Sequence, residues 1–327
     1  MFLAGDIGGT KTVLALYEQQ GGEMLRLREA SVPSRDHARF EDIVDDFLGI
    51  DRPVLRGASF GVAGPVADGV CRTTNLPWRL DENELSARIG CPVKLLNDLE
   101  AAALGMLHIS PEHRAALSTA RRGKDGMTAV IAAGTGLGEA LLFWDGLRYH
   151  VQPTEGGHCD FAPNSAEEDA LLVYLREKLG GHVSVERVLS GPGLYNIWLF
   201  LRDTERAGVM AEGVRQAIEQ ALDPSAEIAR RALDDSDPAC VRALALFCRI
   251  YGAEAGNLAL KCLPSGGVLI GGGIAPKILE FMRRGDFMGG FLDKGRFRDL
   301  LARLPVEVVL EPRAPLIGAA WTARGLA

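Results

Sequence analysis

The sequence predicts an α/β fold of two domains, in which mixed sheets are covered by helices. Three observations support this prediction. The chain of 327 residues is too long for one small core and long enough for two α/β domains. Strand-like and helix-like segments alternate along much of its length, as in sheets covered by helices. A strand, glycine turn and strand occur in that order twice, at 3–16 and 129–143, which indicates a duplicated architecture.

The composition is typical of a soluble globular protein, with 47% hydrophobic and 24% charged residues. A net charge of -7 without a basic stripe argues against a nucleic acid or an anionic membrane as partner. The chain starts directly with a strand and has no long apolar run, so we expect neither a signal peptide nor a membrane span. The six cysteines have no regular spacing and indicate free thiols in a reducing cytoplasm.

The first glycine hairpin has a turn, Gly-Gly-Thr at 8–10, that carries almost no side chains. Bare backbone N–H groups at such a tip, beside a Thr hydroxyl and Lys11, can approach a polyphosphate closely. A plain tight hairpin is the alternative. The second hairpin favours phosphate binding, because its turn at 134–136 repeats the pattern as Gly-Thr-Gly. Two such hairpins suggest one nucleotide held between two halves.

Between the hairpins, Leu25–Val32 is expected to be a strand, and Phe40–Leu48 has apolar residues at helical spacing. An extended segment broken by small residues follows at 60–66. Thr73–Trp78 is then expected to be a loop ahead of a helix that Asp81 caps. This loop either closes off the sheet or forms one wall of a ligand cleft.

Asn97 and Asp98 stand where the buried strand Val93–Leu96 runs into an Ala-rich helix. They therefore lie at the carboxyl end of a strand, the edge where α/β sheets place ligands. A role for Asp98 only as an N-cap is the alternative. An Asn next to an Asp at this junction also suits recognition of a polyol by a general base.

Beyond the second hairpin, Glu155 and His158 are separated by two glycines and can serve one hydroxyl-rich ligand. A metal site is a weak alternative without a second His or further carboxylates, and a structural loop with a satisfied His158 is another. Glu186 lies early in a short helical segment before a Ser-Gly-Pro-Gly turn. It either favours the helix N-terminus by its charge or adds a third polar group for the ligand.

The tract Pro224–Cys262 is expected to be helical and to belong to the core. The strand Gly267–Ile270 ends in three glycines, which open a helix at Ile278–Arg284. These glycines allow a flat ring or a phosphate to lie against the backbone, or they serve tight packing between strand and helix. Val306–Val309 is the last expected strand, and a terminal helix begins at Pro315.

Taken together, these segments resemble the bacterial-type ATP-dependent glucokinase family, within the sugar kinase, Hsp70 and actin superfamily. The resemblance runs from end to end, and several motifs in the correct order are far more specific than any one alone. The motifs that carry it are Asp6–Lys11, Asn75–Trp78, Asn97-Asp98, Gly134–Gly138, Glu155-Gly-Gly-His158, Glu186 with Ser190–Gly193, and Gly271–Pro276.

The resemblance implies two ribonuclease-H-like (actin-like ATPase) domains around a central cleft. The small domain is expected at 1–108 plus 312–327, and the large domain at 109–311. The implied activity is ATP-dependent phosphorylation of D-glucose at the 6-hydroxyl, a step of glycolysis, by a cytoplasmic homodimer. Another hexose kinase of the superfamily, acting on fructose, mannose or an N-acetylhexosamine, is one alternative, and a non-catalytic sugar sensor is another.

The resemblance also implies the ligands of the site. Glucose is expected on Asn97, Asp98, Glu155, His158 and Glu186, with Asp98 as the catalytic base. Asp6 is expected to hold Mg²⁺ through water, and the adenine of ATP is expected near 271–273. The residues predicted to bind ATP are Asp6, Ile7, Gly8, Gly9, Thr10, Lys11, Thr12, Gly134, Thr135, Gly136, Gly271, Gly272 and Gly273.

Overall fold

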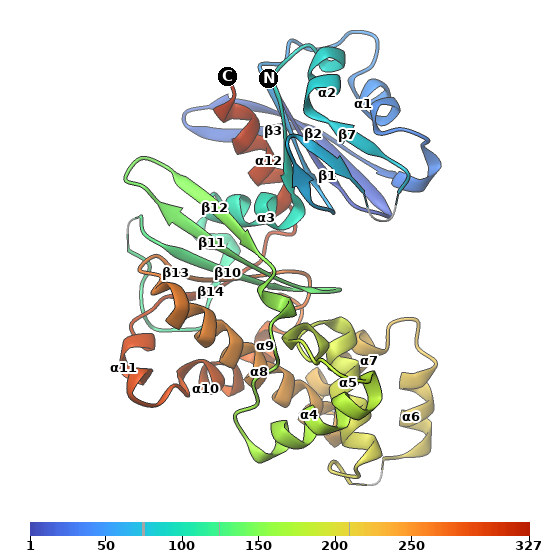
Figure 1. The fold of residues 1–327 in the computed structure, drawn as a ribbon, viewed down its shortest axis with the longest axis vertical. Helices are drawn as coiled ribbons and strands as arrows, with labels where there is room; N and C mark the ends of the chain where they lie inside the picture. The colour runs from blue at the N-terminus through green and yellow to red at the C-terminus, as the bar shows by residue number, and fades with distance from the viewer. Residues whose placement is uncertain (74–75, 124, 209) are drawn as a thin grey trace. The chain divides into compact units, whose positions relative to one another are not determined.

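The computed structural model describes residues 1–73, 76–123, 125–208 and 210–327 (Figure 1). Asn75, which opens the predicted loop at 75–78, lies outside the described residues. The chain divides into two compact units. Unit 1 comprises residues 1–113, 151–153 and 311–327, and unit 2 comprises residues 114–150 and 154–310. The predicted domains, 1–108 plus 312–327 and 109–311, stay a prediction.

Unit 1 is built on a five-stranded mixed sheet in the order β3-β2-β1-β4-β8. The first three strands are antiparallel neighbours, whereas β4 and β8 run parallel to β1. A small second sheet contains β5, β6 and β7. The strands are β1 (Phe2–Ile7), β2 (Lys11–Gln20), β3 (Glu23–Pro33), β4 (Gly57–Val62), β5 (Val66–Ala67), β6 (Val70–Arg72), β7 (Arg79–Asp81) and β8 (Val93–Asn97).

Helices cover both faces of the large sheet of unit 1 (Figure 1). Alternate residues of a strand point to opposite faces. Leu3 and Ile7 of β1 accordingly join a core with residues of α1 and α2, whereas Phe2 and Ala4 pack with α12. The helices of this unit are α1 (Phe40–Leu48), α2 (Glu82–Ile89), α3 (Asp98–Leu107) and α12 (Ala314–Gly325), with short 3-10 helices at Ser34–Asp36 and Pro111–His113.

The C-terminal helix α12 fixes α3 by close backbone packing. A Cβ atom at Gly105 of α3 would lie 1.7 Å from the carbonyl oxygen of Ala314. One at Gly318 of α12 would lie 1.9 Å from the carbonyl oxygen of Ala101. Only glycine allows such an approach. The last helix of the chain therefore sets the position of α3, whose first residue is Asp98.

Trp78 belongs to the core of unit 1. Its side chain is 4% exposed, and its ring lies 6.0 Å from that of Phe40. Its Nε1–H donates to the carbonyl oxygen of His37 at 3.2 Å. Of the two roles considered for the loop before β7, closing off the sheet is the one that Trp78 fulfils. Asp81 accepts hydrogen bonds from two backbone N–H groups of α2, so the predicted cap is confirmed.

Unit 2 is built on a six-stranded mixed sheet in the order β12-β11-β10-β13-β14-β9. β10 pairs antiparallel with β11 and parallel with β13, and β13 pairs parallel with β14. β9 closes the other edge antiparallel to β14. The strands are β9 (Arg114–Ala116), β10 (Thr128–Ala133), β11 (Leu137–Trp144), β12 (Tyr149–Thr154), β13 (Gly267–Gly271) and β14 (Val306–Val309).

The long helix α8 lies at the centre of unit 2, where it packs against β10, α5, α7 and α10. Most of its residues are buried, among them Phe247 and Tyr251. The α-helices are α4 (Ala166–Leu179), α5 (Gly191–Asp203), α6 (Glu212–Glu219), α7 (Pro224–Leu233), α8 (Pro238–Cys262), α9 (Leu279–Met282), α10 (Asp286–Leu292) and α11 (Arg298–Leu301). The 3-10 helices are η3 (Gly156–His158), η4 (Val185–Arg187) and η5 (Gly295–Phe297).

Two helical segments differ from the prediction. The tract 224–262 is two helices, because Pro238 starts α8 and Asp237 caps it through the Cys240 N–H. The helix expected at 278–284 is only α9, flanked by turns, and Gly285 with φ 119° leads directly into α10. Both hairpins and the other predicted strands are confirmed within a few residues.

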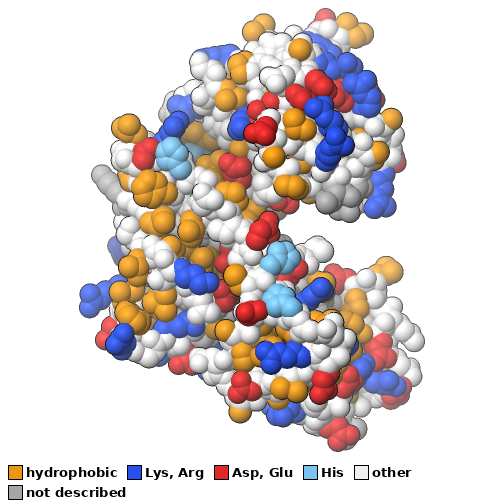
Figure 2. Space-filling model, in the orientation of Figure 1, with side chains coloured by type: hydrophobic (Ala, Val, Ile, Leu, Met, Phe, Trp, Pro, Cys, Tyr) orange, Lys and Arg blue, Asp and Glu red, His pale blue; other side chains and the backbone are white. Residues whose placement is uncertain are grey.

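The surface and the thiols agree with the composition. On the face shown in Figure 2, Lys and Arg side chains are interspersed with Asp and Glu. All six cysteines are free thiols. None of the helices in the described parts of the chain combines the length and apolar character that crossing a bilayer requires.

Candidate active site

The first glycine hairpin is supported by hydrogen bonds from Ser34, and its tip is accessible. The Gly8 N–H donates to the carbonyl oxygen of Lys11 at 3.0 Å, which closes the turn between β1 and β2. The Ser34 hydroxyl donates to the Gly8 carbonyl oxygen at 2.7 Å and lies 2.9 Å from the hydroxyl of Thr12. Thr10 and Lys11 are exposed. The tip is thus rigidly supported while its outer side remains accessible.

Two residues predicted to bind ATP, Ile7 and Thr12, belong instead to the framework of this hairpin. They face each other in the last pair of the β1–β2 ladder. Their exposed fractions are 1% and 0%, and the Thr12 hydroxyl is occupied by Ser34. Buried side chains with satisfied partners have no surface to offer a nucleotide. The assignment of both residues to ATP stays a prediction, and the exposed part of this hairpin lies at Thr10 and Lys11.

Asp6, at the end of β1, lies within the electrostatic reach of Asp98 at the start of α3. Burial, and then the negative charge of Asp98, raise the pKa of Asp6 to about 6, while Lys11 acts in the opposite direction. Two neighbouring carboxylates favour a proton or a cation. Magnesium takes oxygen ligands and is commonly held by one or two carboxylates plus the phosphates of a substrate. These residues therefore fit a magnesium ion that is shared with a nucleotide.

The junction of β8 and α3 places Asn97 and Asp98 as expected, with one correction. Asn97 is the N-cap: its side-chain oxygen accepts the Leu99 N–H at 3.0 Å, and its amide donates to the Gly64 carbonyl oxygen at 3.2 Å. Asp98 is the first helical residue, and its Oδ1 accepts the same Leu99 N–H at 2.8 Å. The interpretation of Asp98 as the N-cap is thus wrong. Its exposed carboxylate is stabilised by the helix N-terminus.

The turn of the second glycine hairpin is hydrogen-bonded to the segment that contains Glu186. The Gly134 N–H donates to the Gly136 carbonyl oxygen, and the Gly134 carbonyl oxygen accepts from the Gly191 N–H, each at 2.8 Å. The Glu186 carboxylate accepts the Leu137 N–H at 2.9 Å. Glu186 therefore supports the hairpin through a direct hydrogen bond. Neither of the two roles expected from the sequence, a charge at a helix N-terminus and a ligand-binding group, includes this bond.

The glycines of this turn have different reasons. A Cβ atom at Gly134 would meet nothing within 4 Å, and its φ is not positive. Neither packing nor conformation in unit 2 requires glycine there, so the missing side chain leaves room for a ligand to approach the turn closely. A Cβ atom at Gly136 would lie 2.6 Å from the Glu186 carboxylate. Glycine at 136 is therefore needed for the hydrogen bond that Glu186 makes.

Glu155 and His158 flank the 3-10 helix η3 and present their side chains to solvent. The His158 Nε2 atom lies 3.7 Å from Glu155 Oε2, and the two side chains are 62% and 91% exposed. η3 itself is pressed onto β11, because a Cβ atom at Gly157 would lie 2.2 Å from the Leu137 carbonyl oxygen. In the described parts of the chain, no three His, Cys, Asp or Glu side chains are arranged to hold a metal ion.

The three glycines at 271–273 also have different reasons. Gly272 has φ 81°, and a Cβ atom there would lie 2.2 Å from the Ala133 carbonyl oxygen, so tight packing explains it. A Cβ atom at Gly273 would meet nothing within 4 Å. Gly271 is a strand residue paired with Ala132. Since α9 begins only at Leu279, a loop rather than a helix N-terminus follows these glycines.

Sequence reasoning missed two residues that support the site. Ser34 carries no local signal, because its role depends on a bond to Gly8 across 26 residues. Glu139 does carry one: it is a charged residue in the otherwise apolar strand β11, where it is 2% exposed. A buried acid without an evident partner is a reason to examine a site.

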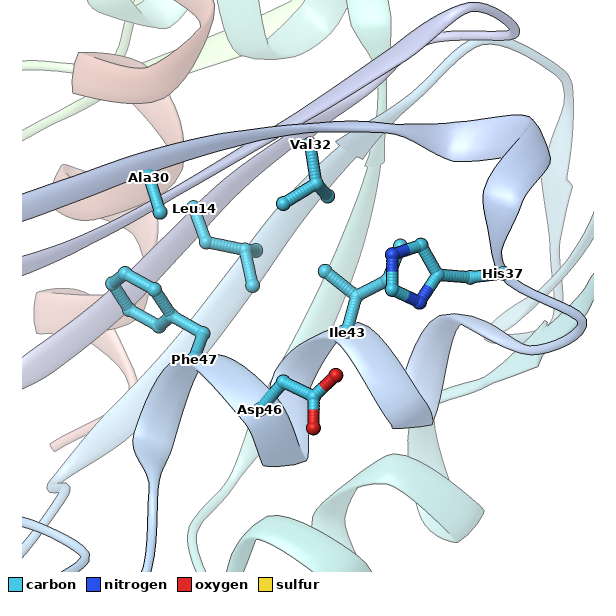
Figure 3. Close-up of a pocket in the computed structure, with 7 residues that line it drawn as sticks. All are labelled: Leu14, Ala30, Val32, His37, Ile43, Asp46 and Phe47. Atoms are coloured by element: carbon cyan, nitrogen blue, oxygen red, sulfur yellow. The ribbon is translucent and has the colours of Figure 1, made fainter.

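A separate cavity in unit 1 has the wrong chemistry for a sugar or a nucleotide (Figure 3). It lies between α1 and the strands β2 and β3, and none of the predicted site residues lines it. Its lining is mainly aliphatic and aromatic. The residues are Leu14, Ala30, Val32, His37, Ile43, Asp46 and Phe47.

Comparisons with known proteins find matches over nearly the whole chain. The family model described as Glucokinase matches residues 3–326. The chain is 42% identical over 341 residues to a glucokinase of Nostoc sp., covering 100% of this chain and 99% of that protein. A glucokinase of Synechocystis sp. is 40% identical over 98% of this chain and 96% of its own length.

Solved structures show the same architecture. A glucokinase from an Antarctic psychrotroph has a TM-score of 0.87 at 28% identity, covering 99% of this chain and 98% of that one. A ROK family glucokinase from Streptomyces griseus, solved in complex with glucose and AMPPNP, has a TM-score of 0.63 at 24% identity and shares the fold. The predicted actin-like ATPase fold class is confirmed by these neighbours. With a family model matched over nearly its full length, the chain belongs to the glucokinase family.

Proposed function

We propose that this protein transfers the γ-phosphoryl group of ATP to the 6-hydroxyl of D-glucose, with Asp98 as general base. The observation that carries the proposal is the place of Asp98. It is an exposed carboxylate at the carboxyl end of β8, and its charge acts on Asp6 beside the first glycine hairpin. A family match over the whole length, to proteins named glucokinase, supports the same reaction.

In this mechanism Asp98 accepts the proton of the 6-hydroxyl as that oxygen attacks the γ-phosphorus. The new bond joins O6 to phosphorus, the bond to the bridging oxygen of ADP breaks, and the proton remains on Asp98. Positioned bases of this kind contribute about 10² to 10⁴ in rate. Phosphoryl transfer otherwise depends on positioning and on stabilisation of charge.

The remaining residues bind and orient the two substrates. Asn97, Glu155, His158 and Glu186 hold the other sugar hydroxyls, which directs the 6-hydroxyl at the phosphorus. The N–H groups of Gly8 and Gly134 close the turns, and the other backbone N–H groups of residues 8–10 and 134–136 bind the phosphates, with Lys11 beside them. The adenine is placed near 271–273, where Gly273 offers open backbone. Asp6 would hold Mg²⁺ through water, and the ion would supply charge neutralisation for the phosphates.

Three further parts of the proposal rest on the family resemblance: a place in glycolysis, a cytoplasmic location and a homodimeric state. Sedimentation velocity tests the last directly, since a single species at the mass of the monomer contradicts it. Magnesium is tested by chelation. EDTA is expected to abolish turnover and added Mg²⁺ to restore it, whereas full activity in EDTA contradicts the role of Asp6.

The decisive test of function is a coupled assay of sugar phosphate formation with a panel of sugars and donors. With ATP, kcat/KM is expected to be highest for glucose, because a site that hydrogen-bonds every hydroxyl penalises a missing or inverted one. A higher kcat/KM for fructose, mannose or N-acetylglucosamine contradicts the assignment of glucose. Binding of glucose without turnover indicates a sugar sensor and contradicts the reaction itself.

A further inference from the structure

Glu139 is a buried acid behind the loop that carries Glu155 and His158. It lies on β11, three residues after Gly136 of the second hairpin turn, and is 2% exposed. Its Oε1 atom is buried without a hydrogen-bond partner among the described residues. The reaction proposed above gives this side chain no role. Because burying an ionised carboxylate is costly, a buried acid at this place calls for a specific explanation.

The loop before η3 rests directly on Glu139. The Thr154 hydroxyl donates to the Glu139 carbonyl oxygen at 2.9 Å, and the Gly156 N–H donates to that hydroxyl at 3.1 Å. A Cβ atom at Gly156 would lie 2.1 Å from Glu139 Oε2. The carboxyl group of Glu139 thus forms the surface on which the first residue of η3 sits. Gly156 is therefore the residue of this loop that lies against the Glu139 carboxyl group.

A second acid faces Glu139 from α8. Glu254 is 7% exposed, and its carboxylate accepts from Asn257 Nδ2 at 2.9 Å. Lys261 lies 4.0 Å from Glu254 and acts on Glu139 in the opposite sense, and Tyr251 of the same helix also lies within electrostatic reach. Burial, and then the charge of Glu254, raise the pKa of Glu139 to about 7. Ionisation of Glu139 therefore places a second negative charge next to Glu254 in a dry environment.

We propose that Glu139 is a positioning residue for glucose binding: its neutral carboxyl group supports η3 and so orients Glu155 and His158. When the group ionises, repulsion from Glu254 and the demand for water displace the carboxylate, and the loop loses its support. The proposal rests on the proposed function only where it assigns glucose to Glu155 and His158. Support of the loop by Glu139 is independent of that assignment.

The test separates KM from kcat across pH. If the neutral form alone binds well, the KM for glucose rises about tenfold between about pH 6 and pH 8, because the competent fraction falls. The kcat, which depends on Asp98, changes much less over this rise. Glu139→Gln keeps the size of the side chain but cannot ionise, so its KM is expected to stay low and nearly flat.

Two companion variants make the test specific. Glu254→Gln removes the facing charge, which lowers the pKa of Glu139 and shifts the rise in KM to lower pH. Glu168→Gln is the matched control: Glu168 is also buried in unit 2, at 1% exposure, but it accepts from the Asn164 N–H at the start of α4. It is expected to keep the wild-type profile. A wild-type rise in KM that persists in Glu139→Gln, or a flat wild-type KM, overturns the proposal.

A second readout does not depend on turnover. Hydrogen exchange of the peptide covering 154–160, corrected for intrinsic rates, reports the order of the loop. Protection in the wild type is expected to fall as pH rises and to stay constant in Glu139→Gln. If Glu139→Gln does not fold, the shift in Glu254→Gln decides. If protection falls with pH but glucose is not phosphorylated, the proposed function is refuted and the role of Glu139 is kept. If glucose is phosphorylated but protection stays constant with pH, the role of Glu139 is refuted and the proposed function is kept.

Discussion

The two glycine hairpins have similar turns but differ in the position of their acidic residue. In the β1–β2 hairpin, Asp6 lies two residues before the turn and is partly accessible beside Asp98. The β10–β11 hairpin has Ala132 at the corresponding place, and its acid, Glu139, follows the turn and is buried beside Glu254. The repeated backbone pattern thus carries a partly accessible acid in one copy and a buried acid in the other.

This difference separates two tasks. The first hairpin and the β8–α3 junction bring carboxylates together near exposed backbone. This arrangement suits proton transfer to a carboxylate and binding of a metal ion. The second hairpin, with Glu186, Glu155 and His158, offers hydrogen-bonding groups on a supported loop, which suits orientation of a ligand. We therefore expect mutations in unit 1 to affect kcat and those in unit 2 to affect KM.

The largest expected effect is on kcat. Asp98→Ala is expected to lower kcat by about 10² to 10⁴, because proton acceptance is lost, while glucose still binds. Asp46→Ala, an exposed acid of the same unit outside the site, is expected to leave both constants unchanged. Glu155→Gln is expected to raise KM with a much smaller effect on kcat. If Asp98→Ala retains kcat within a few-fold, the division of tasks is wrong.

The glycines of the second turn give the next effect. Gly134→Ala is expected to raise the KM for ATP about tenfold, since a methyl group there hinders the close approach of the phosphates, without a change in Tm. Gly136→Ala is expected to lower stability by about 1–3 kcal/mol, because its Cβ atom would displace the Glu186 carboxylate from the Leu137 N–H. ATP titration and thermal melting measure the two effects. An unchanged KM for ATP in Gly134→Ala would remove the bare backbone from the site.

Glu139 and Asp6 differ in the pH range over which their ionisation affects the stability of the protein. The folded pKa of Glu139 is raised from 4.5 to about 7, so folded protein binds this proton more tightly than unfolded protein. Stability therefore falls as pH rises from about 4.5 to 7 and is then level. Glu139→Gln is expected to gain on the order of 3 kcal/mol over wild type at pH 8 and little at pH 4. For Asp6, raised from 3.8 to about 6, the same fall ends near pH 6. Melting curves across pH measure both, and a constant difference between variant and wild type contradicts the ionisation.

The smallest effect lies outside both hairpins. Asp81 accepts the N–H groups of Asn83 and Glu84 at the start of α2. Asp81→Ala is expected to cost about 1 kcal/mol of stability and to leave kcat and KM unchanged. Denaturant unfolding and the coupled assay check this together. A change in either kinetic constant would show that α2 is coupled to the site.

The parts of the fold and site that could be predicted have local causes. Each hairpin follows from alternating apolar residues around glycines, and the β8–α3 junction follows from an apolar run that meets an Ala-rich helix. The order of these motifs was sufficient to identify the family, which the comparisons confirm.

The parts that could not be predicted depend on contacts between distant segments. Ser34 reaches Gly8 only in the folded sheet, and Glu139 meets Glu254 only when α8 packs behind β10. An N-cap role for Asp98 stayed an alternative in the sequence because Asn97 and Asp98 are both good capping residues, and only the backbone geometry distinguishes them. Thr12 was assigned to ATP because a hydroxyl next to a turn does not reveal that Ser34 occupies it.

The most direct measurement of the central claim is the position of the new phosphate ester. The protein is incubated with ATP, Mg²⁺ and D-glucose labelled with ¹³C at C6, and the product is followed by ¹³C and ³¹P NMR. The account predicts that the C6 resonance acquires coupling to phosphorus as ADP accumulates. An ester at another carbon, or ADP formed without any sugar phosphate, would contradict transfer to the 6-hydroxyl.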